Sequence, residues 1–511
     1  MSALISGDRR LSQAALQERA AKAAGGFRAL GIGIGDVVAL YMRNDFAFFE
    51  ASLGAGLAGA YATPINWHFT AEETAYILQD SEAKVLVVHG DLWPRIAGIV
   101  PENVRVFIVP TPPEIAAAYG VADILPPEAA KLTQWEDWLL AQTPLREDTP
   151  PPRNAMIYTS GTTGRPKGVR RAAPTPEQAA GNIVAASTYF GLDPQEEKVI
   201  LMNGPMYHSA PNSYGMMAAR QGATIVLQPR FDAEDMLAMI ERHRITHMHI
   251  VPTMFVRLLK LPEAVKRKYD LSSLRNVVHG AAPCPRDVKL AMIDWWGPVI
   301  NEYYGSTETG IAVWLSAADA LRKPGSVGRI LPGCTVKAFG DDGRELPPGE
   351  IGELYIRAPY IPDFTYNKLD DKRREVARGE LVTVGDVGYV DAEGFVYLCD
   401  RKRDMVISGG VNIYPAEIEA VLIGMPGVKD CAVFGIPDDE FGESLCAYIE
   451  PDDMAAAPSP DAVRSFLAQH VAKYKVPKIV EVVSSLPRED SGKIFKRKLR
   501  APYWEKAGRS I

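Results

Sequence analysis

Short apolar runs recur along the first three hundred residues, and segments with helical patterns separate them. Seven such runs stand at residues 36–42, 83–90, 104–110, 198–206, 223–229, 246–252 and 275–282. Each is rich in Val, Ile or Leu and is bounded by polar or turn residues. Strand-like runs that alternate with helices are typical of βαβ units. This part of the chain is therefore expected to form largely parallel sheets covered by helices.

Two segments show how the sequence marks its helices. Thr70 begins TAEETAYIL and Glu73 follows three residues later, which is the spacing of a capping box at a helix N-terminus. Near the other end of the chain, YPAEIEAVL (414–422) places Pro415 in the first turn of a helix, where proline is tolerated. A strand-like run at 429–438 follows that helix. The end of the chain is therefore expected to form a compact α+β domain.

The amino-acid composition of the chain changes near residue 325. From there to about residue 400 the sequence is rich in Gly and Pro, with hairpin-type turns at 341–343 and 347–349. We therefore expect an α/β protein whose large N-terminal domain of helix-covered β-sheets spans 1–400, with a β-rich subdomain at about 325–400. The α+β C-terminal domain is expected at 401–511.

Composition and charge narrow the class of protein. Of the 511 residues, 47% are hydrophobic and 23% are charged, as in an ordinary globular protein. Lys and Arg number 56 against 63 Asp and Glu, and the net charge of -7 argues against broad binding to nucleic acid. No run of about 18 uncharged apolar residues is present, so no integral membrane segment is expected.

The cysteines and the first residues bear on the cellular compartment. Five cysteines are scattered without a CxxC pair and suggest neither a zinc framework nor a disulfide set. Charged residues at 8–10 interrupt the apolar stretch that a secretory signal needs. A reducing, cytoplasmic location is therefore expected. The sequence does not settle the oligomeric state, and a homodimer is one option.

One twelve-residue segment, YTSGTTGRPKGV (158–169), carries the densest chemistry and directly follows an apolar run. Glycine lets backbone N–H groups approach an anion, hydroxyl groups add donors, and Lys167 adds a charge that can meet phosphate oxygens. The segment is not a Walker A loop, because no Ser or Thr follows Lys167 to hold magnesium. It predicts a phosphate cradle; the alternative interpretation is a flexible surface loop.

Seven segments, in order, resemble the motifs of the adenylate-forming family, which comprises acyl-CoA synthetases, peptide-synthetase adenylation domains and firefly-type luciferases. They are YTSGTTGRPKGV (158–169), PMYHSAP (205–211), HGAAP (279–283), NEYYGSTETG (301–310), VTVGDVGYVDAEGF (382–395), DRKRDMVISGGVNIYPAEIE (400–419) and LPREDSGKIFKRKL (486–499). The resemblance spans nearly the whole chain, and seven motifs in order are far more specific than one.

This resemblance implies an AMP-forming acyl-CoA synthetase that uses ATP, Mg²⁺ and coenzyme A. A carboxylate would attack the α-phosphate of ATP to give acyl-AMP and pyrophosphate, and the thiol of coenzyme A would then displace AMP. Three alternatives stay open: an acyl-AMP ligase that loads a carrier protein, a luciferase-type oxidase, and a nucleotide-binding regulator without catalytic activity.

The resemblance also assigns residues to the nucleotide. The loop at 159–168 would hold the β- and γ-phosphates, Thr307 would contact the α-phosphate, and Glu308 would hold Mg²⁺, with Thr162 as a further ligand. The full set implied for ATP or AMP is Thr159, Ser160, Gly161, Thr162, Thr163, Gly164, Lys167, Gly280, Ala281, Ala282, Glu302, Tyr303, Tyr304, Gly305, Thr307, Asp386 and Arg401.

Within that set, Tyr304 would offer an aromatic face to adenine, and Asp386 and Arg401 would bind the ribose hydroxyls. Taken alone, these three residues fit a core tyrosine, a turn aspartate and a solvated charge.

The C-terminal domain is implied to be small and mobile. Lys493 would stabilise the transition state of adenylation, alongside the other implied catalytic residues Thr307, Glu308 and His208. Rotation about Arg403 would then bring a second surface to the site. Its implied CoA-binding residues are Gly409, Gly410, Tyr474 and Lys478. Without the resemblance, Lys493 and the KRKLR that follows it fit a basic, solvated helix end.

Three positions depart from the family pattern. Arg403 stands where the family usually has Asp or Lys, Asp400 replaces a glycine, and Val384 replaces a threonine. None of these changes removes a charged catalytic group, so the implied class is unaffected.

The acyl pocket is expected, from position relative to the motifs, among aromatic and small side chains. These are Tyr189, Tyr207, His208, Ser209, Asn212, Ala281, Ala282 and Tyr303. No arginine is expected there to pair with a second carboxylate, which disfavours dicarboxylates such as malonate. The small residues and the Met-rich run at 214–219 favour a medium or long fatty acid, or a bulky ring-bearing acid. His208 is expected either to gate this pocket or to form part of its wall.

Three histidines at 243, 247 and 249 invite a metal interpretation. Their spacing crosses a helix-to-strand boundary, and no cysteine or carboxylate completes a ligand set. They are expected to be core and surface histidines instead.

Overall fold

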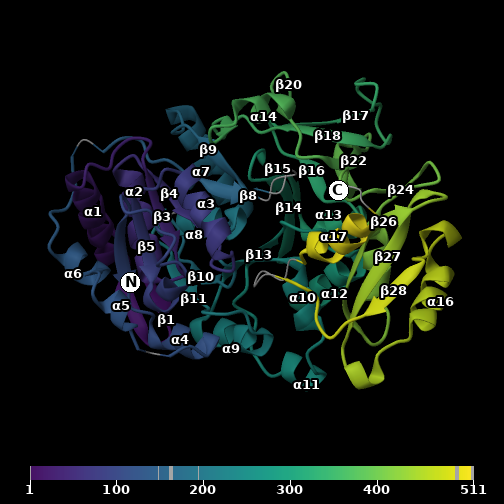
Figure 1. Ribbon diagram of the computed structural model, residues 1–511, viewed down its shortest axis with the longest axis horizontal. Coiled ribbons are helices and arrows are strands. Elements are labelled where there is room, and N and C mark those ends of the chain that lie inside the picture. The colour runs from purple at the N-terminus through teal and green to yellow at the C-terminus, as the bar shows by residue number, and fades with distance from the viewer. Residues whose placement is uncertain are drawn as a thin grey trace.

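Figure 1 shows the computed structural model of the chain, whose strands form four sheets within the described residues. The described ranges are 2–122, 124–147, 149–159, 165–193, 195–488 and 494–507. Helices pack against the sheets of the larger, N-terminal part, and a separate sheet with its own helices forms the C-terminal part (Figure 1). The expected α/β class with a C-terminal α+β domain is confirmed.

An all-parallel sheet lies near the N-terminus, in the strand order β4-β3-β5-β6-β7. Its strands are β3 (Val37–Tyr41), β4 (Tyr61–Pro64), β5 (Val85–His89), β6 (Arg105–Val109) and β7 (Thr133–Gln134). Alternate residues of β3 and β5 enter two different apolar clusters, so the sheet is buried on both faces. The three strand-like runs predicted here are confirmed.

The helices of this region include one that the sequence marked clearly. They are α1 (Gln13–Ala29), α2 (Phe46–Leu57), α3 (Ala71–Asp80), α4 (Pro113–Tyr119), α5 (Pro127–Ala130) and α6 (Trp135–Leu140). At the start of α3, the Thr70 side chain accepts from the Glu73 backbone and the Glu73 carboxylate accepts from the Thr70 backbone. The predicted capping box is therefore confirmed.

The largest sheet changes character halfway along. Its first part consists of β1 (Ala3–Ser6), β2 (Arg9–Ser12), β10 (Val199–Met202), β11 (Thr224–Leu227), β12 (His247–Ile250), β13 (Asn276–His279) and β14 (Ile300–Ser306). All of these strands except β2 run parallel to one another. Beyond β14 the pairing is antiparallel, through β15 (Gly310–Leu315), β16 (Gly328–Ile330), β17 (Thr335–Phe339), β18 (Gly352–Arg357), β20 (Ala377–Arg378), β21 (Leu381–Val382), β22 (Asp386–Val390) and β23 (Phe395–Arg401). The motif at 301–310 thus lies where the parallel part ends.

Further helices flank this sheet, and a small sheet joins it to the N-terminal region. The helices are α7 (Pro176–Phe190), α8 (Ser209–Arg220), α9 (Ala233–His243), α10 (Pro252–Leu259), α11 (Glu263–Lys266), α12 (Arg286–Trp296), α13 (Ala317–Arg322) and α14 (Asp370–Glu375). The small sheet consists of β8 (Ile157–Thr159), β9 (Lys167–Arg171) and β19 (Phe364–Tyr366), paired antiparallel. In the ranges that the structure describes, no helix has the length and apolar character needed to cross a bilayer.

The C-terminal part has its own sheet and its own apolar core. Its elements are β24 (Val406–Ser408), β25 (Val411–Ile413), α15 (Pro415–Ile423), β26 (Val428–Asp438), β27 (Gly442–Pro451), α16 (Pro460–His470), β28 (Ile479–Val482) and α17 (Lys496–Lys506). The predicted helix at 414–422 and strand at 429–438 are confirmed. The last helix, α17, packs on β26, where the Trp504 indole donates to the Gly435 carbonyl at 3.1 Å.

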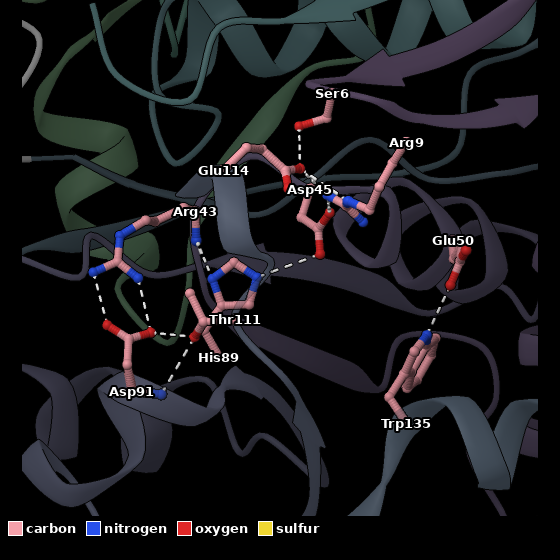
Figure 2. Close-up of polar contacts among 10 residues, drawn as sticks. All are labelled: Ser6, Arg9, Arg43, Asp45, Glu50, His89, Asp91, Thr111, Glu114 and Trp135. Atoms are coloured by element: carbon pink, nitrogen blue, oxygen red, sulfur yellow. Dashed lines mark hydrogen bonds and ion pairs between the residues drawn. The ribbon is translucent and has the colours of Figure 1, made fainter. Parts of the chain in front are cut away.

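A buried polar network ties the first strands to the N-terminal sheet (Figure 2). Arg9 on β2 bonds to Asp45 at 2.7 Å, and Asp45 faces His89 Nε2 at 3.4 Å. Burial alone would raise the pKa of Asp45, but the hydrogen bond with His89 and the charge of Arg9 more than offset it, so the pKa lies below its usual 3.8. The carboxylate is therefore a structural anion at the start of α2.

Candidate active site

A large cavity, of about 3170 Å³, lies between the N-terminal region and the C-terminal domain. Its wall includes β8, the end of β14, the loop after β13, the facing ends of β22 and β23, and residues 494–498. The predicted site residues that line it are Thr159, Lys167, Tyr207, His208, Ser209, Asn212, Ala281, Ala282, Glu302, Tyr303, Tyr304, Gly305, Thr307, Glu308, Asp386, Arg401 and Arg403. Since Arg488 and residues 494–498 of the last motif also line it, the structure brings all seven predicted motifs to one space.

Six predicted site residues lie outside the described residues. They are Ser160, Gly161, Thr162, Thr163, Gly164 and Lys493. Their roles remain predictions.

The described ends of the 158–169 loop belong to β8 and β9, which pair Thr159 with Lys167. The Thr159 hydroxyl donates to Glu308 Oε1 at 3.3 Å, and the Tyr366 hydroxyl donates to the same oxygen at 3.3 Å. The Lys167 ammonium lies 5.1 Å from the centre of the Tyr366 ring. Burial lowers the pKa of Lys167 from its usual value. The Glu308 carboxylate and the Lys167 ammonium thus both contact Tyr366 close to the described ends of this segment.

The turn that carries Thr307 and Glu308 is held by its own side chains. The Ser306 hydroxyl accepts from the backbone N–H groups of Glu308 and Thr309, at 3.1 and 3.0 Å. Before the turn, the strand pairing slips between Tyr304 and Gly305. A Cβ at Gly305 would lie 2.0 Å from the Gly310 carbonyl oxygen, so only glycine allows the two strands to approach this closely. The local sequence therefore fixes where Glu308 points.

Arg171, at the end of β9, holds this turn through hydrogen bonds to its backbone carbonyl groups. Its guanidinium donates to the Thr307 carbonyl at 2.8 Å, to the Glu308 carbonyl at 2.5 Å, and to the Pro362 carbonyl. Burial lowers the pKa of Arg171 to about 10, so the group stays charged at neutral pH. Sequence reasoning missed this residue, because an arginine at a strand end gives no signal of the carbonyl groups that it will meet.

At the next strands, a tyrosine, an aspartate and an arginine form a short chain of contacts. The Tyr304 hydroxyl donates to Asp386 Oδ2 at 2.7 Å, and Arg401 Nε lies 3.3 Å from Asp386 Oδ1. Asp386 and Arg401 are direct partners in the β22–β23 pairing. Burial and the nearby carboxylate raise the pKa of Tyr304 well above its usual value. Each Asp386 oxygen keeps a second acceptor site, so the carboxylate can still receive two hydroxyl groups.

The loop after β13 adopts a strained backbone beside this chain. Ala281 has φ +66°, the left-handed region that residues with a side chain seldom occupy. Gly280 lies beneath Tyr303, since a Cβ there would meet the ring at 2.7 Å. Ala281 and Ala282 line the cavity with exposed side chains, whereas Gly280 is buried behind them. The strain presents these two small residues to the cavity.

Two of the predicted nucleotide residues already have buried partners. The Glu302 carboxylate pairs with the Lys289 ammonium, which also donates to the Ser326 carbonyl at 3.2 Å. Burial raises the pKa of Glu302. The Tyr303 hydroxyl shares a hydrogen bond of 2.9 Å with His249 Nε2. Both residues line the cavity, but their polar atoms already bond to Lys289 and His249 of the protein.

The predicted acyl-pocket residues cluster at the start of α8. Asn212 donates to the Met206 carbonyl at 2.9 Å, which fixes the chain around Tyr207 and His208. The buried Tyr207 ring meets the Trp67 ring edge-on at 6.2 Å. Ser209 is the first residue of the helix. This corner of the cavity is thus walled by rings and small polar groups.

Two expectations about the acyl pocket are wrong. Tyr189 does not line the cavity but packs on Trp314 at 5.4 Å; the next residue along α7, Phe190, lines it instead. One step along a helix turns a side chain by about 100°, and the sequence does not show which residue faces inward. An arginine does reach the cavity, because Arg220, the last residue of α8, lines it.

The C-terminal domain presents the start of α17 to the cavity. Lys496 lies on the cavity wall and pairs with Glu419 at 2.7 Å. Arg500 contacts residues 403–404, which precede the first strand of the C-terminal sheet. Its guanidinium lies 3.7 Å from the Asp404 carboxylate and 3.5 Å from the Arg403 carbonyl oxygen. Burial lowers the pKa of Arg403. These contacts hold the start of α17 at the cavity wall.

The residues predicted to bind CoA are not among those that line the cavity. Gly409 and Gly410 both have positive φ, at +57° and +82°, in the turn between β24 and β25. Tyr474 is 55% exposed, and Lys478 pairs with Asp438 at 2.6 Å. The domain arrangement seen here therefore places the 494–498 segment at the cavity and leaves this second surface elsewhere.

The three histidines that invited a metal interpretation have other partners or positions. His247 bonds to Thr246 at 2.8 Å and His249 to Tyr303, while His243 ends α9. Burial lowers the pKa of both His247 and His249 to about 4, so they are neutral at physiological pH. Among the residues described, three or more metal-ligating side chains nowhere gather into one group.

Comparison with known proteins gives a consistent result. Residues 1–362 match the family model described as AMP-binding enzyme, and residues 417–493 match the AMP-binding enzyme C-terminal domain. The chain is 34% identical over 500 residues to the long-chain-fatty-acid–CoA ligase FadD13 of Mycobacterium tuberculosis, which covers 97% of this chain and 94% of the relative. It is 32% identical over 519 residues to the fatty acid–[acyl-carrier-protein] ligase ScoC of Streptomyces coeruleorubidus, covering 100% and 95%.

Among solved structures, the fold is similar to that of the anthranilate CoA ligase AuaEII in complex with anthranoyl-AMP. The TM-score is 0.84 at 26% identity, over 99% of this chain and 95% of that one.

Proposed function

The chain belongs to the AMP-binding enzyme family and is an acid–thiol ligase of the AMP-forming type, and we propose that it works in two steps through an acyl-AMP intermediate. In the first step a carboxylate oxygen bonds to the α-phosphorus of ATP, and pyrophosphate leaves. In the second step the sulfur of coenzyme A bonds to the acyl carbon, and AMP leaves.

The observation that carries this proposal is the convergence of seven separate sequence segments on one cavity. Thr159 on β8 and Glu308 in the turn after β14 meet at 3.3 Å, and Tyr304 and Asp386 meet at 2.7 Å across three intervening strands of the sheet order. Charge develops on phosphate oxygens in the first step, and donors fixed in advance stabilise it without reorganisation. Such fixed groups are what adenylation requires.

Each part of the cavity then has a role. Lys167 and the loop that precedes it would bind the β- and γ-phosphates, and Thr307 would contact the α-phosphate. Asp386 would accept the two ribose hydroxyls, while Tyr304 and Arg401 hold its carboxylate in place. Lys493 would lie between the carboxylate and the α-phosphate and offset their negative charge.

Glu308 suits a magnesium ion that arrives with ATP. Its carboxylate is oriented by Thr159 and Tyr366 through one oxygen, and Mg²⁺ is commonly held by one or two carboxylates together with phosphate oxygens. When bound, the ion would neutralise charge on the phosphates. The same Thr159 and Tyr366 hydroxyls keep the Glu308 side chain turned toward the phosphate loop.

The arrangement of the C-terminal domain favours the first step, because the segment next to Lys493 lines the cavity. We expect the domain to rotate about Arg403 for the second step and to bring Gly409 and Gly410 to the site. No dedicated base is needed, since a thiol with a pKa of about 8.5 is partly ionised at neutral pH.

The acid is proposed to have an apolar body, either a medium or long chain or a bulky ring system. The part of the cavity beyond His208 is lined by Phe190, Met216 and Met217, which form an apolar and pliable wall. Relatives named for a long-chain fatty acid and for anthranilate share the fold, so the family alone does not select between chain and ring.

One alternative to coenzyme A as the thiol that accepts the acyl group has specific support. ScoC, a ligase named for an acyl-carrier-protein, covers the whole of this chain at 32% identity. A carrier-protein thiol would then replace coenzyme A in the second step. The first step and its residues would be the same.

A panel of carboxylic acids tests the proposal. The enzyme is incubated with ATP, Mg²⁺ and each acid, with coenzyme A or with a phosphopantetheinylated carrier protein, and AMP and thioester are measured by chromatography. We expect AMP and acyl-CoA in equal amounts for an apolar acid. Thioester on the carrier alone would establish the alternative acceptor, and no AMP with any acid would refute the proposed function.

A further inference from the structure

Helix α8 has one face toward the cavity and one toward the core. Beyond its first turn the cavity-lining residues are Ser213, Tyr214, Met216, Met217 and Arg220, together with Gln221 just after the helix. Gly215, Ala218 and Ala219, which are absent from this wall, are buried. This spacing of three and four is that of a single helical face, so the cavity follows α8 from His208 to Arg220.

Arg220 lines the cavity, and its side chain keeps exposed surface there. Desolvation by the surrounding protein lowers the pKa of its guanidinium. A guanidinium keeps its positive charge in proteins.

Arg220 also differs in its contacts from two other arginines that line the cavity, Arg171 and Arg401. Within the described ranges, no carboxylate, carbonyl or aromatic ring bonds to it, whereas Arg171 donates to three carbonyls and Arg401 pairs with Asp386. A guanidinium that lines a cavity without a protein partner keeps its N–H donors available for a ligand. The missing partner is therefore expected to be a ligand.

We propose that Arg220 binds an oxygen acceptor at the far end of the acyl substrate, and that a second carboxylate is the acceptor that it fits best. The inference rests on the proposed function, because it assumes that the acid lies along α8. A guanidinium only donates hydrogen bonds, and a carboxylate can accept two of them side by side. A ketone oxygen shares the acceptor chemistry but not the charge.

The helix also sets the length of this substrate. From Ser209 to Arg220 the axis of α8 spans roughly 16 Å, since 11 steps rise about 1.5 Å each. Arg220 therefore lies too far from His208 for malonate to bridge them, and a long α,ω-diacid is favoured instead. Met216 and Met217 lie between the two ends and suit an apolar middle.

A different role for Arg220 comes from its position in the helix. Arg220 is the last residue of α8, where its positive charge can interact favourably with the helix dipole. That interaction would affect the stability of the protein and not its choice of acid. Substrate selectivity therefore separates the two roles.

Pairs of acids with the same chain length test the proposal. Wild-type enzyme is assayed for kcat/KM by pyrophosphate release with a monocarboxylate, its ω-dicarboxylate and its methyl ketone counterpart, over a series of lengths. We expect a preference of about 30-fold for the dicarboxylate at one length near the span of α8, and a smaller preference for the ketone. Arg220→Met should abolish both preferences while the monocarboxylate is still activated.

Arg329→Met on β16 is the matched control, because Arg329 is exposed and does not line the cavity. It should leave every ratio unchanged. Calorimetric binding of the preferred diacid to wild type and to Arg220→Met gives a second readout that does not depend on turnover.

The outcomes separate this inference from the function on which it rests. If acids are activated but the ratio of diacid to monoacid is the same in wild type and Arg220→Met, the inference is wrong and the proposed function stands. A loss of melting temperature without a change in that ratio would assign Arg220 to the helix dipole. If no acid releases pyrophosphate, both proposals fail.

Discussion

At the proposed nucleotide end of the cavity, the Asp386 and Glu308 carboxylates are already held by other side chains, whereas at the proposed acyl end Arg220 has no such partner in the part of the chain that the structure describes. Tyr304 and Arg401 engage both oxygens of Asp386, and Thr159 engages Glu308. The same cavity therefore joins a region completed by the protein to a region that a ligand would complete.

This difference follows from what each end has to bind. ATP is the same in every turnover, so donors and acceptors fixed in advance reduce the reorganisation needed in the transition state. The acyl part varies among relatives, which are named for long-chain fatty acid and anthranilate. Substituting a few side chains on an apolar wall is enough to change the specificity for the acid.

The largest effect is expected when the lysine proposed to bridge the two ends is removed. Lys493→Ala should lower acyl-AMP formation about 1000-fold, because an uncompensated charge then develops at the α-phosphate. Conversion of supplied acyl-AMP to acyl-CoA should be largely unchanged. Rapid-quench assays of the two half-reactions measure this, with Lys506→Ala at the exposed end of α17 as the control. Equal loss in both half-reactions would contradict the two-conformation account.

A smaller effect is expected at the ribose. Asp386→Asn keeps the size of the side chain but removes its charge and two acceptor sites, so kcat/KM for ATP should fall roughly 100-fold. The KM for the acid should change little, because the acyl end is separate. Tyr304→Phe, which removes only the hydroxyl that orients Asp386, should cost about 5-fold. A comparable rise in the KM for both substrates would mean that the two ends are not independent.

The third prediction concerns the turn behind Glu308. Arg171→Met removes the donor to the Thr307 and Glu308 carbonyls and should lower kcat about 10-fold by displacing the turn. Arg170→Met is the matched control, because Arg170 is the neighbouring residue on β9 and bonds instead to Asn367 and the Gly35 carbonyl. Steady-state kinetics with saturating acid distinguish them. Equal activity of the two variants would remove Arg171 from the positioning role.

The smallest effect on activity is expected far from both ends. Asp45→Asn should leave kcat/KM nearly unchanged at neutral pH, yet cost about 3 kcal/mol of stability in urea unfolding, because Arg9 and His89 lose a buried anion. The pKa of Asp45 lies below its usual 3.8, so its contribution is complete above that pH and is lost as the pH falls further. The difference between wild type and variant should therefore shrink below pH 3.8. A constant difference would show that the carboxylate charge is not responsible.

Much of the fold follows from local patterns in the sequence. The alternation of apolar runs with helical patterns gives β3, β5, β6 and β10 to β13, and Thr70 with Glu73 marks the start of α3. The short strands β4, β7 and β9 were not predicted. These signals are local, because strand propensity and helix capping depend on neighbouring residues. The joining of the later antiparallel strands to the same sheet as β14 depends on long-range pairing that no local pattern shows.

The candidate site divides in the same way. Motif residues such as Asp386 and Glu308 were found because their segments resemble a family, and the structure places them on one cavity. Arg171 and Tyr366 were missed because their contacts depend on β9 and β19 pairing across nearly two hundred residues of chain. Tyr189 and Arg220 were misjudged because the inward face of a helix depends on what packs against it.

The central claim is that a preformed nucleotide end makes acyl-AMP before any thiol is involved. The most direct test mixes enzyme, ATP, Mg²⁺ and an activated acid without coenzyme A and measures pyrophosphate and acyl-AMP in the first turnover. The account predicts a burst of one pyrophosphate and one acyl-AMP per active site, followed by a slow phase. Pyrophosphate release that begins only when coenzyme A is added would contradict it.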